Sequence, residues 1–315
     1  MNTVARPGDA GVAAVHARRS LALVALFAGA LGIATSGIFV RLSETGPAAT
    51  AFWRGALALP GLALWALIAL PRGEPRSAAL LAPLRDRRLY WAGFYFAGDL
   101  ALWHWSLLLT AVAASTLEAN LAPILVTLIA WLAWKERPRP RFLVALALAL
   151  AGVVLMVAPK LGGGGRALTG DLLGIGTACF YAGYILVMSR LRTAYSTGVI
   201  MFWTSLVFSV LLLPLALTQK MLPDDLHGWL LLAGLALCAQ VFGQGLIAFA
   251  LAHLPATFGS VGLYVQPVAA GFYAWLILGE RLTGLQMLGA VVVLLAIALA
   301  RSAQRPRPVS RRAGQ

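Results

Sequence analysis

Long apolar runs separated by short polar gaps dominate the chain. Ten runs approach the length of about 20 residues that a helix needs to cross roughly 30 Å of hydrocarbon. They lie near residues 21–40, 47–70, 89–109, 112–134, 142–158, 171–189, 198–217, 229–252, 256–278 and 283–300. No run alternates over about ten residues as membrane β-strands do. The pattern predicts an all-α integral membrane protein with ten transmembrane helices.

The composition supports this interpretation. Of 315 residues, 60% are hydrophobic and 11% are charged, whereas soluble domains carry about 25% charged residues. The net charge of +14 would suggest a nucleic-acid partner in a soluble protein. Here the basic residues occupy the gaps between apolar runs, so we expect a lipid bilayer as partner and no nucleic acid. Cys179 and Cys238 lie inside apolar runs without ligand spacing, so we expect no metal site and no cofactor.

The basic residues also predict the orientation. If the N-terminus and every second loop face the cytoplasm, 19 Lys and Arg lie on that side and 5 on the other. Both termini are therefore predicted to be cytoplasmic, with an N-terminal tail at 1–20 and a basic tail at 301–315. The first run is too long for the core of a signal peptide and is expected to remain as the first span.

The two halves of the chain resemble one another at an offset of 144 residues. Pro123, Trp131, Glu136 and Arg137 map onto Pro267, Trp275, Glu280 and Arg281. The pair Phe52-Trp53 is echoed by Phe202-Trp203, with a shift of six residues. Five helices is an odd number, so a second repeat at 171–300 must enter the membrane inverted relative to the first at 21–158, with a linker loop at 159–170. Inverted repeats are typical of secondary transporters, whose substrate site lies near the midplane.

These motifs resemble those of the drug/metabolite transporter superfamily, specifically its EamA-type ten-helix exporters. The stretch that carries the resemblance runs from Pro123 to Arg137, and its copy runs from Pro267 to Arg281. The segment 98–105 (GDLALWHW) is similar to one subgroup, and the resemblance covers about 21–300.

The resemblance implies a secondary transporter of the bacterial cytoplasmic membrane that exports a small metabolite by alternating access through a central cavity. Aromatic amino-acid exporters belong to this family, which implies amino acids as a substrate class. One departure is Glu118, where the family more often has an apolar residue. One chain contains both halves, so we expect a monomer.

Ionisable residues at membrane depth cost about 2.5–3.5 kcal/mol each, and they usually face an aqueous cavity or a partner. Asp99 lies near the middle of the third span and is the leading candidate to bind a substrate amine or carry a proton; an ion pair between helices is the alternative. Trp103 and Tyr95 lie four residues either side of Asp99 on the same helical face. Their rings suit an aromatic or cationic substrate, or else anchor the helix at the membrane interface.

Glu118 and Asn120 of the fourth span could share a cavity with Asp99. Alternatively, Glu118 pairs with Arg54 of the second span in a structural tie. Further cavity candidates are Gln240, Gln244, Gln266, Tyr181 and Tyr264. Amides orient ligands but also hold helices together, so both interpretations stay open. Architectural roles are expected for Pro123 and Pro267, which interrupt backbone bonding, and for Glu136 and Glu280, which cap helix ends.

Two other function classes remain as alternatives. A membrane-embedded enzyme could use Asp99, His104 and Glu118 on a lipid-linked substrate, although the loops are short. A channel would more naturally surround the axis of an oligomer. No phosphate-binding loop or nucleophile elbow occurs in the sequence, so ATP is not a direct energy source, and proton coupling is compatible with a protonatable carboxylate.

Overall fold

The computed structural model describes residues 7–68, 70, 75–134, 140–158, 165–253 and 256–304. These ranges contain helices and no strand, which confirms the all-α prediction. The first half comprises α1 (Pro7–Ala34), α2 (Ser36–Leu42), α3 (Pro47–Ala56), α4 (Leu59–Ile68), α5 (Arg76–Leu81), η1 (Ala82–Arg85), α6 (Arg87–Leu109), α7 (Val112–Ala119), α8 (Ala122–Trp134) and α9 (Pro140–Val157). The second comprises α10 (Gly165–Leu191), α11 (Thr197–Ala216), α12 (Leu226–Gly234), the π-helix η3 (Leu235–Gly243), α13 (Gln244–His253), α14 (Ala256–Leu278) and α15 (Gly284–Gln304).

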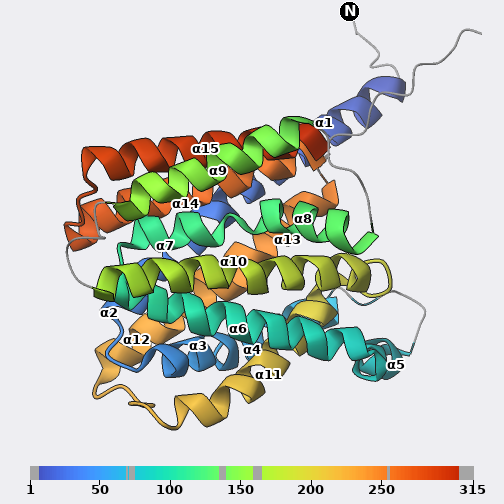
Figure 1. The fold of residues 1–315 in the computed structure, drawn as a ribbon. Coiled ribbons are helices and arrows are strands. Elements are labelled where there is room, and N and C mark those ends of the chain that lie inside the picture. Colours follow the sequence, from blue (N-terminus) through green and yellow to red (C-terminus); the bar gives the residue numbers. More distant parts are fainter. Residues whose placement is uncertain are drawn as a thin grey trace, which may run out of the picture.

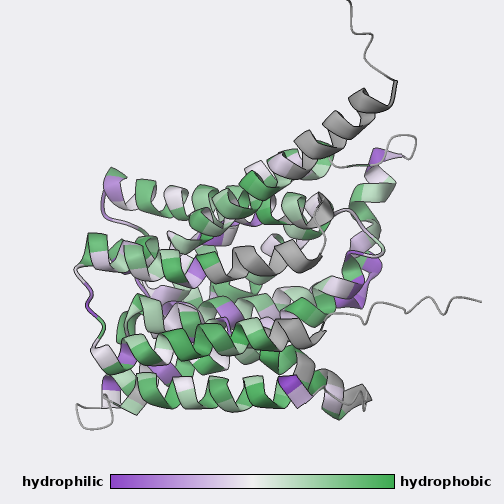
Figure 2. Ribbon diagram, turned by 90° about the horizontal axis from the view of Figure 1, so that it is seen from above, coloured by the Kyte–Doolittle hydropathy of each residue, from purple (hydrophilic) through white to green (hydrophobic). Residues whose placement is uncertain are grey.

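The outside of the helix bundle is apolar. Among the described residues, five helical segments are long and apolar enough to cross a membrane: Ser20–Leu42, Pro47–Ile68, Gly165–Leu191, Thr197–Ala216 and Leu226–Ile247. Large aliphatic side chains such as Leu64, Leu150 and Leu295 are about 60% exposed. Figure 2 shows apolar residues along the helices and many of the polar ones at helix ends and in connections. Exposure of such an apolar surface to water would be unfavourable in free energy, whereas contact with the hydrocarbon chains of lipid would not be.

Within the described ranges, three of the predicted spans are interrupted, at Thr35, between α3 and α4, and between α7 and α8. The side chains at two of these breaks bind nearby carbonyls: Thr35 Oγ1 donates to Gly32 O at 2.7 Å, and Asn120 Nδ2 donates to Thr116 O at 2.7 Å. Such bonds occupy carbonyls near the point where the helix ladder is interrupted. At the start of α4, Pro60 lacks an N–H.

The prolines predicted to interrupt helices differ in position. Pro123 is the second residue of α8, directly after a break, whereas α14 continues without interruption through Pro267. The side chains of Pro123 and Tyr264 lie outside the described residues, and so does the whole of Glu136.

Two pairs of equivalent helices from the two halves pack antiparallel in the described structure (Figure 1). Helices α3 and α4 lie along α11, with Ala48 N donating to Gln219 Oε1 at 2.9 Å near one end and Gly198 against Ala66 near the other. Helix α9 lies along α15 in the same manner. In addition, α6, the third span, packs on α10, the sixth, and α1, the first span, packs on η3 and α13, which form the eighth. The first and third spans of one half correspond to the sixth and eighth of the other, so these two contacts are equivalent when the halves are exchanged. This arrangement agrees with inverted repeats.

The two Phe-Trp pairs that correspond in the sequence, Phe52-Trp53 and Phe202-Trp203, also make equivalent contacts in the structure. The indole N–H of Trp53 donates to Met221 O at 2.8 Å, and that of Trp203 donates to Leu80 O at 2.7 Å. Each tryptophan meets its preceding phenylalanine edge to face, with ring centroids 5.1 Å apart in both pairs. Each indole therefore ties the second span of its repeat to the segment that follows the second span of the other repeat: Met221 lies between α11 and α12, and Leu80 lies in the short helix α5.

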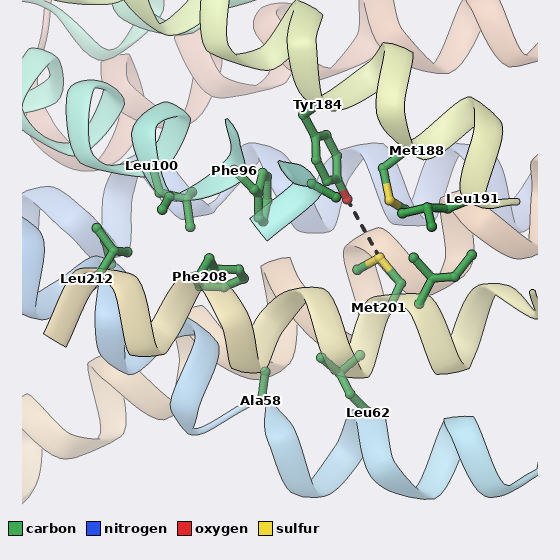
Figure 3. Packing of buried hydrophobic residues seen from close by; sticks show 14 of the residues in the cluster. Ala58, Leu62, Phe96, Leu100, Tyr184, Met188, Leu191, Met201, Phe208 and Leu212 are labelled. Carbon is green, nitrogen blue, oxygen red and sulfur yellow. Dashed lines mark hydrogen bonds between the residues drawn. The ribbon is translucent and has the colours of Figure 1, made fainter. Parts of the chain in front are cut away.

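An aromatic cluster fixes α6 between α10 and α11 (Figure 3). Phe96 of α6 stacks on Tyr184 of α10 at 4.6 Å and meets Phe208 of α11 edge to face at 5.1 Å. The Tyr184 hydroxyl reaches Met201 Sδ at 4.0 Å. Aromatic pairs contribute about 0.5–1.5 kcal/mol each beyond their burial. The cluster thus positions the helix that carries Asp99 and Trp103.

Candidate functional site

A central cavity gathers polar residues from both halves of the chain. Six residues that the sequence singled out as cavity candidates line it: Asp99, Trp103, Asn120, Tyr181, Gln244 and Gln266. The other lining residues are Ile33, Ser36, Arg54, Phe96, Leu100, Thr116, Ala119, Thr177 and Ile247. The space open to the centre of a water molecule is about 80 Å³. One water needs about 10–15 Å³ of such space, so the cavity has room for several waters or for part of a compact solute.

Two helix interruptions border the cavity. Ile33 and Ser36 lie on either side of the break between α1 and α2, and Ala119 and Asn120 lie at the break between α7 and α8. Discontinuous helices are the usual way in which transporters bring backbone polar groups to a midplane binding site. Both breaks therefore bring the ends of helical segments of the first half to the wall of the cavity.

Asp99 lies on α6 and is 8% exposed. It accepts no hydrogen bond within the part of the chain that the structure describes. Buried carboxylates are ordinarily bonded to protein or water. Its acceptor capacity is therefore available to a ligand in the cavity.

Trp103 and Thr116 supply donors to the same cavity. Neither the indole Nε1 of Trp103 nor Oγ1 of Thr116 has a hydrogen-bond partner among the described residues, although both atoms are buried. A buried donor left without an acceptor costs about 1–3 kcal/mol, which a bound solute or water would recover. Together with Asp99, these groups form a polar face opposite apolar lining such as Phe96 and Leu100.

Arg54 is 3% exposed and reaches the cavity from α3. Its Nε donates to Gln240 Oε1 at 3.1 Å, and Gln240 Nε2 donates to Ser205 Oγ at 3.2 Å. The structure thus pairs Arg54 with an amide of η3 rather than with Glu118, the partner considered from the sequence. Gln240 is fully buried and holds Arg54 instead of lining the cavity.

Two further predicted cavity residues face elsewhere. Tyr95 packs against Gly183 and Phe180 of α10, one turn beyond the cavity. Glu118 is 1% exposed, and its carboxylate covers Gly174 of α10. Both side chains therefore belong to helix contacts with α10.

The three residues of the enzyme alternative do not meet. Of Asp99, His104 and Glu118, only Asp99 lines the cavity. His104 is fully buried, and its Nδ1 lies 3.1 Å from Pro47 O, so this nitrogen is the donor. Within the described ranges, no group of three or more His, Cys, Asp or Glu could hold a metal ion.

Glu280 joins three helices at the end of the bundle that carries the loops near 44 and 220. Its Oε1 pairs with Arg41 of α2 at 2.5 Å, and its Oε2 accepts from Val112 N, the first residue of α7, at 2.9 Å. Gly279 turns the chain out of α14 with φ of 67°, a conformation that glycine adopts without strain. The carboxylate therefore caps the N-terminus of a helix in the other half of the chain.

Sequence reasoning missed the hydroxyls of Ser36, Thr116 and Thr177. Small hydroxyl residues in a span carry a weak signal, because most of them bond to a carbonyl of their own helix. Ser36 and Thr177 do so, with Ile33 O at 2.5 Å and Leu173 O at 2.9 Å. The unpartnered Oγ1 of Thr116 becomes visible only in the structure.

The chain resembles known membrane proteins in sequence and in fold. It is 27% identical over 201 residues to the uncharacterized transporter YwfM of Bacillus subtilis, covering 62% of this chain and 67% of that one. It is also 27% identical over 193 residues to the pseudopaline exporter CntI of Pseudomonas aeruginosa, covering 61% and 66%. Each match spans about two thirds of the relative.

A solved crystal structure has the same fold. It superposes with a TM-score of 0.62 at 18% identity, over 91% of this chain and 100% of that chain.

The model of the EamA-like transporter family matches residues 20–158 and again residues 168–302. The two matches fall on the halves that pack antiparallel, and together they cover most of the chain. With its apolar helices and its cavity between two copies of the family domain, this chain is an integral, multi-pass membrane protein that belongs to the EamA-like transporter family.

Proposed function

We propose that this protein exports small metabolites, with amino acids and among them aromatic ones as the leading class, by alternating access through the central cavity. Family membership makes it a membrane transporter of small molecules. Export agrees with the name of one relative, the pseudopaline exporter. The observation that carries the proposal is Asp99, a buried carboxylate without a hydrogen bond in the described part of the chain, in a cavity bordered by interrupted helices from one repeat and lined by polar residues from both.

The proposal includes the membrane arrangement. Ten helices cross the bacterial cytoplasmic membrane as two inverted repeats at 21–158 and 171–300, with both termini in the cytoplasm. The asymmetry of basic residues supports this orientation, and the antiparallel packing of equivalent helices supports the inversion. The end of the bundle that carries Glu280 is then the outer one.

In the proposed cycle, rocking of one repeat against the other exposes the cavity to each side in turn. Asp99 binds the ammonium group of the substrate or exchanges it for a proton, and the Trp103 ring lies against the substrate side chain. One chain provides both repeats, so the proposed transporter acts as a monomer.

The test is transport by the purified protein in liposomes, using labelled phenylalanine and leucine. Saturable uptake that Asp99→Asn lowers about 30-fold or more, and that Trp103→Ala weakens, is the expected result. Arg281→Gln is the matched control, because Arg281 is exposed and lies away from the cavity. Uptake that never saturates would indicate a channel, and the absence of uptake for every amino acid would overturn the substrate class.

A further inference from the structure

Arg54 is held in a fixed orientation at the edge of the cavity. Its Nε donates to Gln240, which in turn donates to Ser205 of α11. Gln240 belongs to the π-helix η3, a rare helical form that often occurs at functional sites. The guanidinium plane is therefore set by side chains from two other elements.

Most of the hydrogen-bonding capacity of Arg54 is unused. A guanidinium has five N–H donors in a planar fork, and within the described ranges only the Nε–H has a partner. Asp99 lines the same cavity, yet no nitrogen of Arg54 lies within 4.0 Å of its carboxylate. A buried guanidinium whose donors lack direct acceptors is costly, so the unused donors of Arg54 present an open site for an anionic group in the cavity.

The geometry points to Arg54 as the residue that binds the carboxylate of a zwitterionic solute, whose ammonium group binds Asp99. This inference rests on the proposed function and deepens it, because it restricts the substrate to molecules that carry both charges. The flat fork of Arg54 suits a carboxylate, which it can bind through two parallel N–H···O bonds. A solute with no net charge would neutralise both cavity residues at once, and the apolar lining of Phe96 and Leu100 would contact its side chain.

A site that uses both Arg54 and Asp99 should prefer different ligands from a site that uses Asp99 alone. A cavity that recognises amines through Asp99 alone would accept phenethylamine and phenylalaninamide as readily as phenylalanine. A cavity that uses Arg54 as well would reject both analogues, because neither offers a carboxylate. Removing one partner of a buried charge pair costs about 2–5 kcal/mol, so both should bind about 30-fold or more weakly than phenylalanine.

The experiment measures competition for labelled phenylalanine on the purified wild-type protein in detergent, with phenylalanine, phenylalaninamide and phenethylamine as competitors. The wild-type protein with these three ligands tests the inference without a substitution, so a variant that fails to fold does not affect it. Arg54→Lys keeps the charge but loses the fork, and it should retain part of the preference for the acid. Arg54→Gln should bind phenylalanine and its amide equally and weakly.

The outcomes separate the two proposals. Equal affinity of the wild-type protein for phenylalanine and its amide would overturn the role of Arg54 and leave amino-acid export standing. Failure of every amino acid to bind would overturn both. A preference for the acid that persists in Arg54→Gln would also contradict the assignment, since another group would then bind the carboxylate.

Discussion

Arg54 and Arg41 are both cations carried by helices, and they are used differently. At the end of the bundle that carries the loops near 44 and 220, Arg41 forms an ion pair with Glu280, whose second oxygen accepts from Val112 N. In the central cavity, Arg54 uses one nitrogen on an amide, and Asp99 accepts no hydrogen bond from a described residue. Arg41 and Glu280 therefore bind each other, whereas Arg54 and Asp99 keep unused hydrogen-bonding capacity at the cavity.

This difference suggests how to separate architecture from function among ionisable residues in a membrane protein. A charge whose hydrogen-bonding capacity is met by the fold contributes to stability, and its loss is felt in unfolding. A charge that the fold positions but does not satisfy reduces stability and is retained for a ligand. Substitutions in the two regions should therefore have opposite effects on transport and on unfolding.

The largest expected effect is on transport by Asp99→Asn. Loss of this carboxylate should lower transport about 30-fold or more, because a buried charge contact is worth about 2–5 kcal/mol. Stability should be unchanged or higher, since the amide removes the cost of a buried charge. Transport in liposomes and unfolding in detergent, measured on the same preparation, test both halves of the statement. A large drop in stability with proportionate loss of transport would make Asp99 a structural residue.

Glu280→Gln is expected to do the reverse. The substitution weakens the bonds to Arg41 and to the N-terminus of α7, so the free energy of unfolding should fall by about 1.5–3 kcal/mol. The folded fraction should still transport substrate. Chemical unfolding in mixed micelles measures the loss, with Arg281→Gln as the neighbouring exposed control. Unchanged stability together with abolished transport would remove the distinction between the two regions.

The sequence predicts the helices well because apolar runs of membrane length report burial in lipid directly. It does not predict the breaks at Thr35 and at Asn120, since hydropathy averaged over a span is insensitive to a single lost backbone bond. These breaks border the cavity, so the missed features are the ones that shape the site.

Some of the predicted cavity residues line the cavity and others do not, because packing between helices decides which side chains reach it. Asp99 could be selected because a charge in a span is rare and costly. The partner of Arg54 could not, because Gln240 lies 186 positions away and is placed by packing between the repeats. Tyr95 shares a helical face with Trp103, yet α10 approaches through Gly183 at its level and closes off the cavity there. Periodicity fixes which residues share a face, and the neighbouring helices decide which of them reach the cavity.

A smaller effect is expected for Trp103→Phe, which keeps an aromatic ring and removes the indole N–H. That N–H has no acceptor among the described residues, so the substitution breaks no bond within them. If the donor binds substrate, KM should rise about 2- to 12-fold, as a hydrogen bond worth about 0.5–1.5 kcal/mol implies. Transport kinetics at several substrate concentrations provide the test. A KM that stays at the wild-type value would limit Trp103 to contact through its ring.

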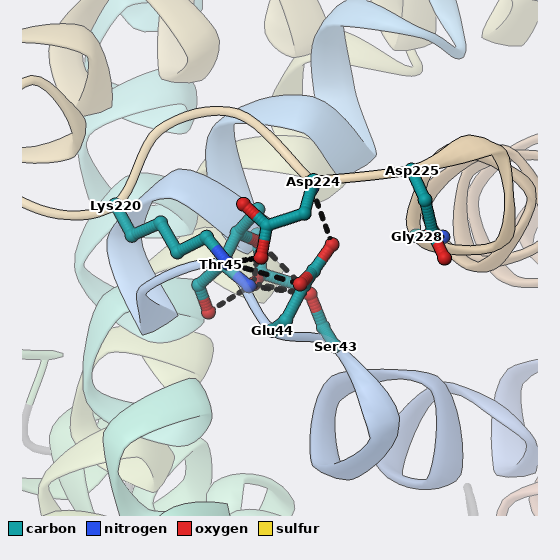
Figure 4. A network of polar contacts seen from close by, with 8 residues as sticks. Ser43, Glu44, Thr45, Lys220, Asp224, Asp225 and Gly228 are labelled. Atoms are coloured by element: carbon teal, nitrogen blue, oxygen red, sulfur yellow. Dashed lines mark hydrogen bonds and ion pairs between the residues drawn. The ribbon is translucent and has the colours of Figure 1, made fainter.

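The smallest effect is expected at the exposed network beside Glu280, where Lys220 bonds Glu44 at 2.9 Å and Asp224 at 2.5 Å (Figure 4). Exposed ion pairs contribute little and are screened by salt, so Lys220→Gln should shift the unfolding midpoint slightly, and less so in high salt. The hydrogen bond from Lys220 holds the pKa of Asp224 below its usual range. Its stabilising contribution is therefore present above the pKa of the unfolded chain, about 3.9, and is lost as the pH falls through the lowered folded value. Unfolding midpoints of wild type and variant should differ near neutral pH and converge in acid. A midpoint shift as large as that of Glu280→Gln would show that exposure does not separate the two networks.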